Sequence, residues 1–362
     1  MSLLGRIGID LPIVQAPMAG VSSPAMAAAV SEAGALGSIA VGATDAYGAR
    51  AMIAEVKART ARPFNVNLFC HRPAVADAAK EAAWIERLRP VFADYGAEPP
   101  AALRETYRSF VEDEAMLALL VAERPRVVSF HFGLPPASAI AALRDAGILL
   151  FASATRLDEA RAAVNAGVDA VIAQGWEAGG HRGMFDPDAP DERLGTMALT
   201  RRLVTAIDLP VIAAGGIMDG RGIAGALDLG AAAAQLGTAF VATDESLADA
   251  AYRSALASDA AQHTVMIRAI SGRPARGLPN HFAAIGESAP ASDIPAFRSR
   301  TIWEKRSTSP RRRAVSSAMA RNGRGKGHRS SGLCPRCSSS RSSLRNSPRR
   351  RGPDPRRRRW LP

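Results

Sequence analysis

A histidine in a glycine-rich loop is the residue of this sequence best suited to acid–base chemistry. His181 lies in the run Gln174–Gly183, four residues after Glu177. Because imidazole titrates near neutral pH, His181 could remove a proton from a carbon acid, the alternative being a solvent-exposed loop histidine. His131 ends another apolar run and either lines the same cavity or is a hydrogen-bonded core histidine. No second His or Cys has a suitable spacing to His181, so we predict no metal site.

Two consecutive glycine-containing segments have the pattern of a phosphate-binding site. Gly215 and Gly216 follow one apolar run, and Gln235-Leu236-Gly237-Thr238 ends the next. Successive glycines let backbone N–H groups approach an anion, whereas the alternative interpretation is only a tight turn. We therefore predict that the two segments together bind a phosphate-bearing cofactor.

Three further side chains at the ends of apolar runs could contact a planar ring. Asn67 and Gln174 carry amides, which offer both a donor and an acceptor and so suit the edge of a flavin. The alternative is a pair of solvated loop residues. Met18 follows Pro17, where its thioether could pack on a flat ring or fill the core.

These candidates follow apolar runs that alternate with Ala-rich helical segments. Most runs are short and rich in Val, Ile, Leu or Phe, as expected for strands buried on both faces. We predict eight strands, at Ile13–Ala16, Leu36–Ala40, Phe64–Phe69, Arg126–Phe132, Ile148–Ser153, Ala170–Gln174, Pro210–Ala214 and Ala232–Leu236. Eight strands in alternation with helices favour an α/β fold, a closed parallel (β/α)8 or TIM barrel, over an open sheet. In that fold the functional residues gather at the carboxyl ends of the strands.

The intervening helices are predicted from their composition and their glycine ends. The candidates are Pro24–Ala33, Ala46–Arg59, Pro136–Ala146, Arg156–Ala166, Thr196–Ile207 and Arg221–Leu229. Glycines at 34, 147, 167 and 230 are expected to end four of them. The alternation breaks at residues 73–124, which we interpret as a helical insertion after the third strand, near the substrate site. Residues 1–72 and 125–297 then form the barrel.

The net charge of +12 comes from one end of the chain. Residues 298–362 contain 21 basic and 2 acidic residues, which leaves a net charge of −7 for residues 1–297. The globular part therefore gives no reason to expect specific nucleic-acid binding. Three cysteines, Cys70, Cys334 and Cys337, are too few for a disulfide framework. With no apolar span and no signal-peptide pattern, we expect a cytoplasmic protein without membrane contact; no pattern predicts its oligomeric state.

Over residues 7–297 the sequence resembles the nitronate monooxygenases, formerly grouped as 2-nitropropane dioxygenases. The most specific resemblance is the run Gln174–Gly183, supported by the runs Gln15–Gly20, Pro63–Phe69 and His131–Gly133. The resemblance implies that FMN is held by Asn67, Gln174, Gly179, Gly216 and Gln235-Leu236-Gly237-Thr238, and it makes His181 the catalytic histidine. To these cofactor-binding candidates we add Met18, Gly180 and Gly215.

The reaction implied by the resemblance is FMN-dependent oxidation of alkyl nitronates by O2 to carbonyl compounds and nitrite. A nitroalkane would first lose its α-proton to His181. The alternative is a related FMN barrel that uses NAD(P)H, such as a quinone reductase or an enoyl-thioester reductase, because such enzymes share the phosphate cradle. The related inosine-monophosphate dehydrogenase type needs a nucleophilic loop cysteine, and Cys70 follows the wrong strand.

The Arg-, Ser- and Pro-rich segment 298–362 has the composition of a disordered tail and of GC-rich DNA translated out of frame. The chain contains 42 Arg and 4 Lys, which indicates a GC-rich gene. Residues 322–336 can be encoded so that the frame one nucleotide back resembles the family's C-terminal ending. We therefore hypothesise a frameshift near Phe297. A damaged, inactive product is then a second alternative to an active enzyme. Cys334 and Cys337 form a single C-x-x-C pair, which is not sufficient for a zinc knuckle.

Overall fold

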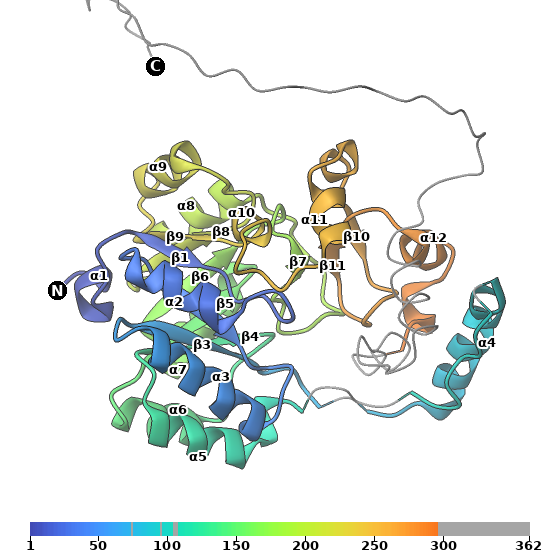
Figure 1. Ribbon diagram of the computed structural model, residues 1–362, viewed down its shortest axis with the longest axis horizontal. Helices are drawn as coiled ribbons and strands as arrows, with labels where there is room; N and C mark the ends of the chain where they lie inside the picture. The colour runs from blue at the N-terminus through green and yellow to red at the C-terminus, as the bar shows by residue number, and fades with distance from the viewer. Residues whose placement is uncertain (74, 95, 104–107, 296–362) are drawn as a thin grey trace, which may run out of the picture. The chain divides into compact units, whose positions relative to one another are not determined.

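Eight parallel strands form the centre of the computed structural model, which describes residues 1–73, 75–94, 96–103 and 108–295 (Figure 1). The strands are β1 (Ile13–Gln15), β2 (Gly37–Ala40), β3 (Phe64–Phe69), β4 (Val127–His131), β5 (Leu149–Ala154), β6 (Ala170–Gln174), β8 (Val211–Ala214) and β9 (Ala233–Leu236). Each coincides with a predicted strand to within one residue at either end. Most of their residues are buried, as the continuous apolar runs predicted.

The sheet closes on itself. Its strand order is β1-β9-β8-β6-β5-β4-β3-β2, with every neighbouring pair parallel. The two outer strands meet at a parallel bridge between Val14 and Leu36, where Gln15 N donates to Leu36 O at 2.9 Å. The predicted TIM barrel is therefore confirmed.

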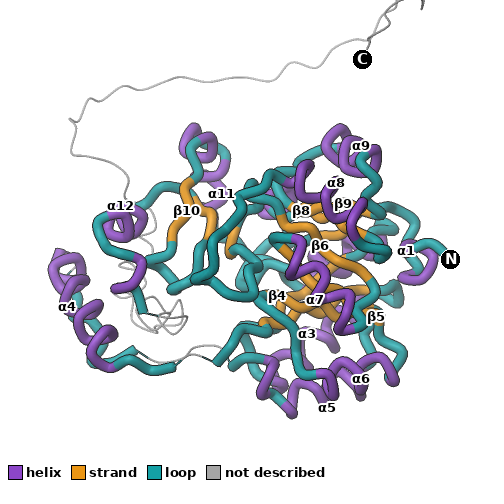
Figure 2. Tube along the Cα trace, turned by 180° about the vertical axis from the view of Figure 1, so that it is seen from behind, coloured by secondary structure: helices purple, strands orange, loops and turns teal. Residues whose placement is uncertain are grey.

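Helices cover the outside of the strands (Figure 2). They are α1 (Leu3–Ile7), α2 (Pro24–Glu32), α3 (Ala46–Arg59), α5 (Glu114–Glu123), α6 (Ala137–Asp145), α7 (Leu157–Ala166), α8 (Thr196–Ala206), α9 (Gly220–Asp228) and α10 (Thr238–Val241). The glycines predicted to end four helices have φ values of 79–96°, the left-handed conformation that lets a chain leave a helix sharply. None of the described helices is both long and apolar enough to cross a membrane.

A second, smaller hydrophobic core is formed by two segments that are far apart in the sequence. It joins α4 (Ala78–Asp94) to the segment that carries β10 (Val265–Ile267) and α12 (His281–Glu287). Trp84, Leu88 and Phe92 of α4 are buried there, together with Ile267, Ala269 and Ala283. The remaining elements of the chain are α11 (Ala250–Leu256), β7 (Gly180–His181), β11 (Ala275–Gly277) and 3-10 turns at Asp259–Gln262, Ala291–Asp293 and Phe110–Glu112, the last of which packs in the barrel core.

The structure divides the segment 73–124 between these two cores. Helix α4 contributes to the smaller core, whereas α5 lies beside α3 and α6 in the ring of barrel helices. Leu119 and Leu120 of α5 are buried in the barrel core. The predicted tail, residues 298–362 with Cys334 and Cys337, lies outside the described residues.

Candidate active site

The loop that carries His181 is held by a small antiparallel sheet. Residues Gly180 and His181 form β7, which pairs with β11, and β11 pairs with β10. In this register His181 lies opposite Ala275, and Arg182 N donates to Pro274 O at 2.9 Å. A loop from the middle of the chain is thus fixed by residues almost a hundred positions later.

The His181 ring has two described neighbours that orient it. Its Nε2 lies 2.8 Å from Ser271 Oγ, and its ring meets the Phe132 ring edge-on with centroids 5.8 Å apart. Burial, and after it the charge of Arg273, lower the pKa of His181 to about 4. The imidazole is therefore uncharged at neutral pH, the state in which a histidine can accept a proton.

His131, at the end of β4, lies next to His181. Its Nδ1 is 3.0 Å from Ser153 Oγ, and its Nε2 is 3.4 Å from the backbone oxygen of His181. The pKa of His131 is lowered to about 3. Burial is the largest cause, and His181 and Arg273 add to it. A Cβ at Gly183 would lie 2.8 Å from His131 Cε1, so the loop approaches this ring closely because residue 183 is a glycine.

The two predicted amides are engaged by protein groups at the strand ends. Gln174 Nε2 donates to His181 O at 2.9 Å, and Gln174 Oε1 accepts from Gly183 N at 2.7 Å. Gln174 is thus hydrogen-bonded to the backbone of the His181 loop on both sides of Arg182. Asn67 Nδ2 donates to the hydroxyl of Ser129 at 2.9 Å and to its backbone oxygen at 3.1 Å.

The glycines after β8 need the conformational freedom that the phosphate-cradle prediction assumed. Gly215 and Gly216 have φ values of 121° and 67°. A Cβ at Gly215 would lie 2.7 Å from Thr196 Oγ1, and one at Gly216 would lie 3.0 Å from Glu177 Cβ. Glu177 is fixed in turn, since its Oε2 accepts from Thr196 N at 2.7 Å.

The segment after β9 meets the loop after β6 and the loop after β1. A Cβ built on Gly179 would lie 3.3 Å from Thr238 Oγ1, and one on Gly237 would lie 3.6 Å from Met18 Sδ. Gln235 Oε1 is buried and accepts no hydrogen bond from the described residues. A buried acceptor without a hydrogen bond, close to glycines that leave backbone N–H groups accessible, is an environment in which a bound ligand could donate the missing hydrogen bond.

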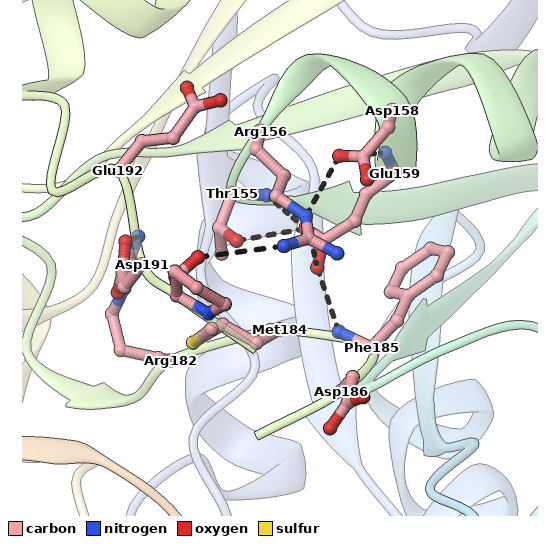
Figure 3. Close-up of polar contacts among 12 residues, drawn as sticks. Thr155, Arg156, Asp158, Glu159, Arg182, Met184, Phe185, Asp186, Asp191 and Glu192 are labelled. Atoms are coloured by element: carbon pink, nitrogen blue, oxygen red, sulfur yellow. Dashed lines mark hydrogen bonds and ion pairs between the residues drawn. The ribbon is translucent and has the colours of Figure 1, made fainter. Parts of the chain in front are cut away.

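A buried carboxylate that the sequence analysis did not single out anchors the far side of the His181 loop (Figure 3). Glu159 Oε2 accepts from Thr155 N at 2.7 Å and from Thr155 Oγ1 at 2.8 Å, while its Oε1 accepts from Phe185 N at 2.9 Å. Its side chain is 2% exposed. In the sequence Thr155 stands four residues before Glu159 at a helix start, a local spacing that gives no hint of the contact to Phe185.

Ser271 and Arg273 were also missed. Both are buried, and both belong to the turn between β10 and β11, a segment for which the sequence predicted neither a strand nor a helix. Arg182, the neighbour of His181, is satisfied by a paired contact to Asp191 at 2.9 and 3.0 Å and by the backbone oxygens of Gln174 and Gly175.

Cys70 is buried and free, and burial raises the pKa of its thiol, which disfavours the reactive thiolate.

Comparison with known proteins places these features in a family. A family model described as nitronate monooxygenase matches residues 2–327. The chain belongs to the nitronate monooxygenase family. The membership inferred from the run Gln174–Gly183 is thereby confirmed. A nitronate monooxygenase of Paraburkholderia phytofirmans is 61% identical over 295 residues, which cover 82% of this chain and 80% of that protein.

Two groups of solved structures resemble this member of the nitronate monooxygenase family. A nitroalkane oxidase from Streptomyces ansochromogenes has a TM-score of 0.76 and 42% identity, and the match covers 86% of this chain and 88% of that one. FabK from Thermotoga maritima has a TM-score of 0.61 and 32% identity, with 78% and 75% covered. The structure with the higher TM-score, the nitroalkane oxidase, is thus consistent with the family assignment.

Proposed function

We propose that this protein is an FMN-dependent enzyme that oxidises alkyl nitronates with O2 to carbonyl compounds and nitrite. Neutral nitroalkanes would enter the same reaction after losing an α-proton. Membership of the nitronate monooxygenase family supports the reaction class. The observation that carries the proposal is the position of His181, uncharged and fixed by Gln174 and Ser271 at the barrel end where the glycine cradle lies.

The residues at this end of the barrel fit FMN. We assign the phosphate to the backbone of Gly215, Gly216, Gly237 and Thr238. Gly215 and Gly216 have positive φ values, and as glycines they have no side chain that would obstruct an anion. The buried, unsatisfied Gln235 Oε1 is an acceptor suited to a ring N–H. The flavin ring is assigned to Met18, Asn67, Gln174, Gly179, Gly180, Gln235 and Leu236.

In the proposed mechanism the protein supplies a base, its orientation and exclusion of water. When bound, FMN would supply the redox chemistry between substrate and O2. His181 accepts the α-proton of a nitroalkane, and a preformed nitronate needs no such step. Ser271 holds His181 Nε2, and Gln174 fixes the backbone on either side of Arg182, so that the ring keeps one orientation. His131 lines the same space.

Anaerobic reduction of the flavin tests this proposal against its alternative. An FMN-dependent NAD(P)H:quinone or enoyl-thioester reductase would have the same cradle, so that activity is the second candidate. We expect a nitronate to bleach the flavin absorbance without NADH, and NADH alone to leave it unchanged. Bleaching by NADH alone would reverse the ranking of the two activities.

We further propose that residues 298–362 result from a frameshift near Phe297. Their composition supports this. Resequencing the gene, with an intact mass of the natural protein, tests it; an unbroken frame would contradict it. If the product is damaged and inactive, the purified protein will lack a flavin spectrum.

A further inference from the structure

Arg273 is a buried cation at the centre of a cluster of three histidines. Its side chain is 2% exposed, and its guanidinium carbon lies 4.4 Å from the centroid of the Phe132 ring. The same ring contacts His71, His131 and His181, with centroid distances of 6.4, 4.4 and 5.8 Å. Phe132 itself has a φ of 73°, a left-handed conformation that costs free energy in a non-glycine residue.

The charge of Arg273 is retained at neutral pH despite its burial. Desolvation, followed by the nearby Arg268, lowers the pKa of Arg273 to about 10, and three carboxylates oppose this effect. Its Nη2 donates to Met184 O at 2.8 Å and to Phe185 O at 3.4 Å. The ring face of Phe132 adds a favourable cation–π contact. Arg273 is thus anchored to the loop that follows His181.

The turn that contains Arg273 also holds the ring of His181. Ser271 Oγ contacts His181 Nε2 at 2.8 Å, and the same hydroxyl lies 3.3 Å from Arg273 O and 3.4 Å from Arg273 N. Ser271 is therefore held on its other side by the backbone of Arg273. One short turn brings both a fixed positive charge and a fixed hydroxyl to the candidate base.

We propose that Arg273 is a positioning residue, which disfavours protonation of the His181 ring and, through Ser271, fixes its orientation. The inference rests on the proposed role of His181 as the base. A nearby cation disfavours protonation of an imidazole, and Arg273 contributes in this sense to the lowered pKa of His71, His131 and His181, after burial. The other charged or titratable groups that act on these histidines or on Arg273 are Arg182, Arg268, Asp186, Asp188 and Glu159.

The test compares three variants of the full FMN-containing protein. Arg273→Met removes the charge but keeps a chain of similar length over Phe132, and Arg273→Lys restores the charge. Arg268→Met is the matched control, because Arg268 also anchors the loop, at Pro187 O (3.1 Å) and Asp188, without contacting a histidine ring. The readouts are the titration of His181 by NMR with histidine-selective labelling, and the pH profile of kcat/KM for a neutral nitroalkane.

For Arg273→Met we expect the His181 titration and the acid limb of the profile to move up by about one pH unit or more. At a pH on that limb, kcat/KM then falls roughly tenfold, since one pH unit corresponds to a tenfold change in the uncharged fraction. Arg273→Lys should return both to near the wild-type position, and Arg268→Met should leave both in place. An unmoved His181 titration in Arg273→Met, or an equal movement in Arg268→Met, would overturn the proposal.

If Arg273→Met does not fold, Ser271→Ala decides the second half of the proposal. It keeps the charge of Arg273 and removes the hydroxyl at His181 Nε2. We expect kcat for a neutral nitroalkane to fall roughly tenfold with little change in KM, and wild-type kcat would contradict the proposal. Failure of the proposed function is a separate result: the wild-type protein would then not oxidise nitronates, while the NMR titration still tests Arg273.

Discussion

The buried carboxylate of Glu159 gives a quantitative test of how the His181 loop is anchored. The change is Glu159→Gln, which keeps the volume but replaces one acceptor oxygen by an NH2 donor. Glu159 accepts from Thr155 on one oxygen and from Phe185 N on the other. A glutamine can satisfy only one of these sides, because its NH2 group meets an N–H donor on the other.

The expected loss of stability follows from counting these hydrogen bonds. One partly buried donor loses its acceptor, at a cost of about 1–3 kcal/mol, and the remaining bonds lose their charge assistance. Because glutamine avoids part of the desolvation cost of a buried charge, we expect a net loss of about 2–3 kcal/mol. For a domain of this size that lowers Tm by roughly 3–5 °C. Freed from Glu159, Phe185 would also let the His181 loop move, so nitronate turnover should fall.

Thermal unfolding followed by circular dichroism, together with nitronate turnover, is the assay. Asp158→Asn is the matched control, because Asp158 lies on the same helical turn but is 68% exposed and pairs with Arg156 at the surface. Such exposed pairs contribute about 1 kcal/mol or less. A Glu159→Gln protein as stable as wild type, or an equal loss in Asp158→Asn, would refute the reasoning.

Three further predictions concern the base, the cradle and pH. His181→Asn should lower turnover of neutral nitroalkanes at least about 100-fold while FMN still binds; unchanged turnover excludes His181 as the base. Gly216→Ala, at a φ of 67°, should weaken FMN binding in a fluorescence titration, whereas Gly220→Ala, with open space around it, should not. Because burial lowers the pKa of His71, His131 and His181 to about 4, 3 and 4, unfolding takes up protons below about pH 6.5. Stability should therefore fall as the pH drops from about 6.5 to 4, and a Tm unchanged between pH 6.5 and 5 would contradict this.

The barrel could be predicted because its signals are local. Strand β3 and strand β6 have the predicted bounds, since each is a short, mainly apolar run with a clear local limit: β3 begins directly after Pro63, and β6 lies between Asp169 and Gly175. The helix ends at Gly34 and Gly167 were likewise determined by the one residue type that readily adopts a positive φ. The segment 73–124 was harder, because no local signal in its sequence shows that α4 and α5 pack into different cores.

The candidate site could be predicted only in part, because its members differ in how far their partners lie along the chain. His181 was found from its own loop, whose glycines and histidine are adjacent in sequence. The contacts that hold it were not: Ser271 lies 90 residues from His181 and Arg273 lies 88 residues from Phe185. No periodicity or spacing links a serine in one loop to a histidine in another.

By itself, then, the sequence predicted a parallel barrel and proposed, as candidates for the chemistry, residues whose strand ends this barrel brings to one edge. Only the tertiary structure decided how His181 is held and how far its pKa is lowered. The residues and elements involved are β11, Ser271, Arg273 and Glu159. The physical reason is that strand and helix formation depend on neighbours within a few residues. The orientation and pKa of a buried imidazole depend instead on burial and on charges that folding brings together from distant segments.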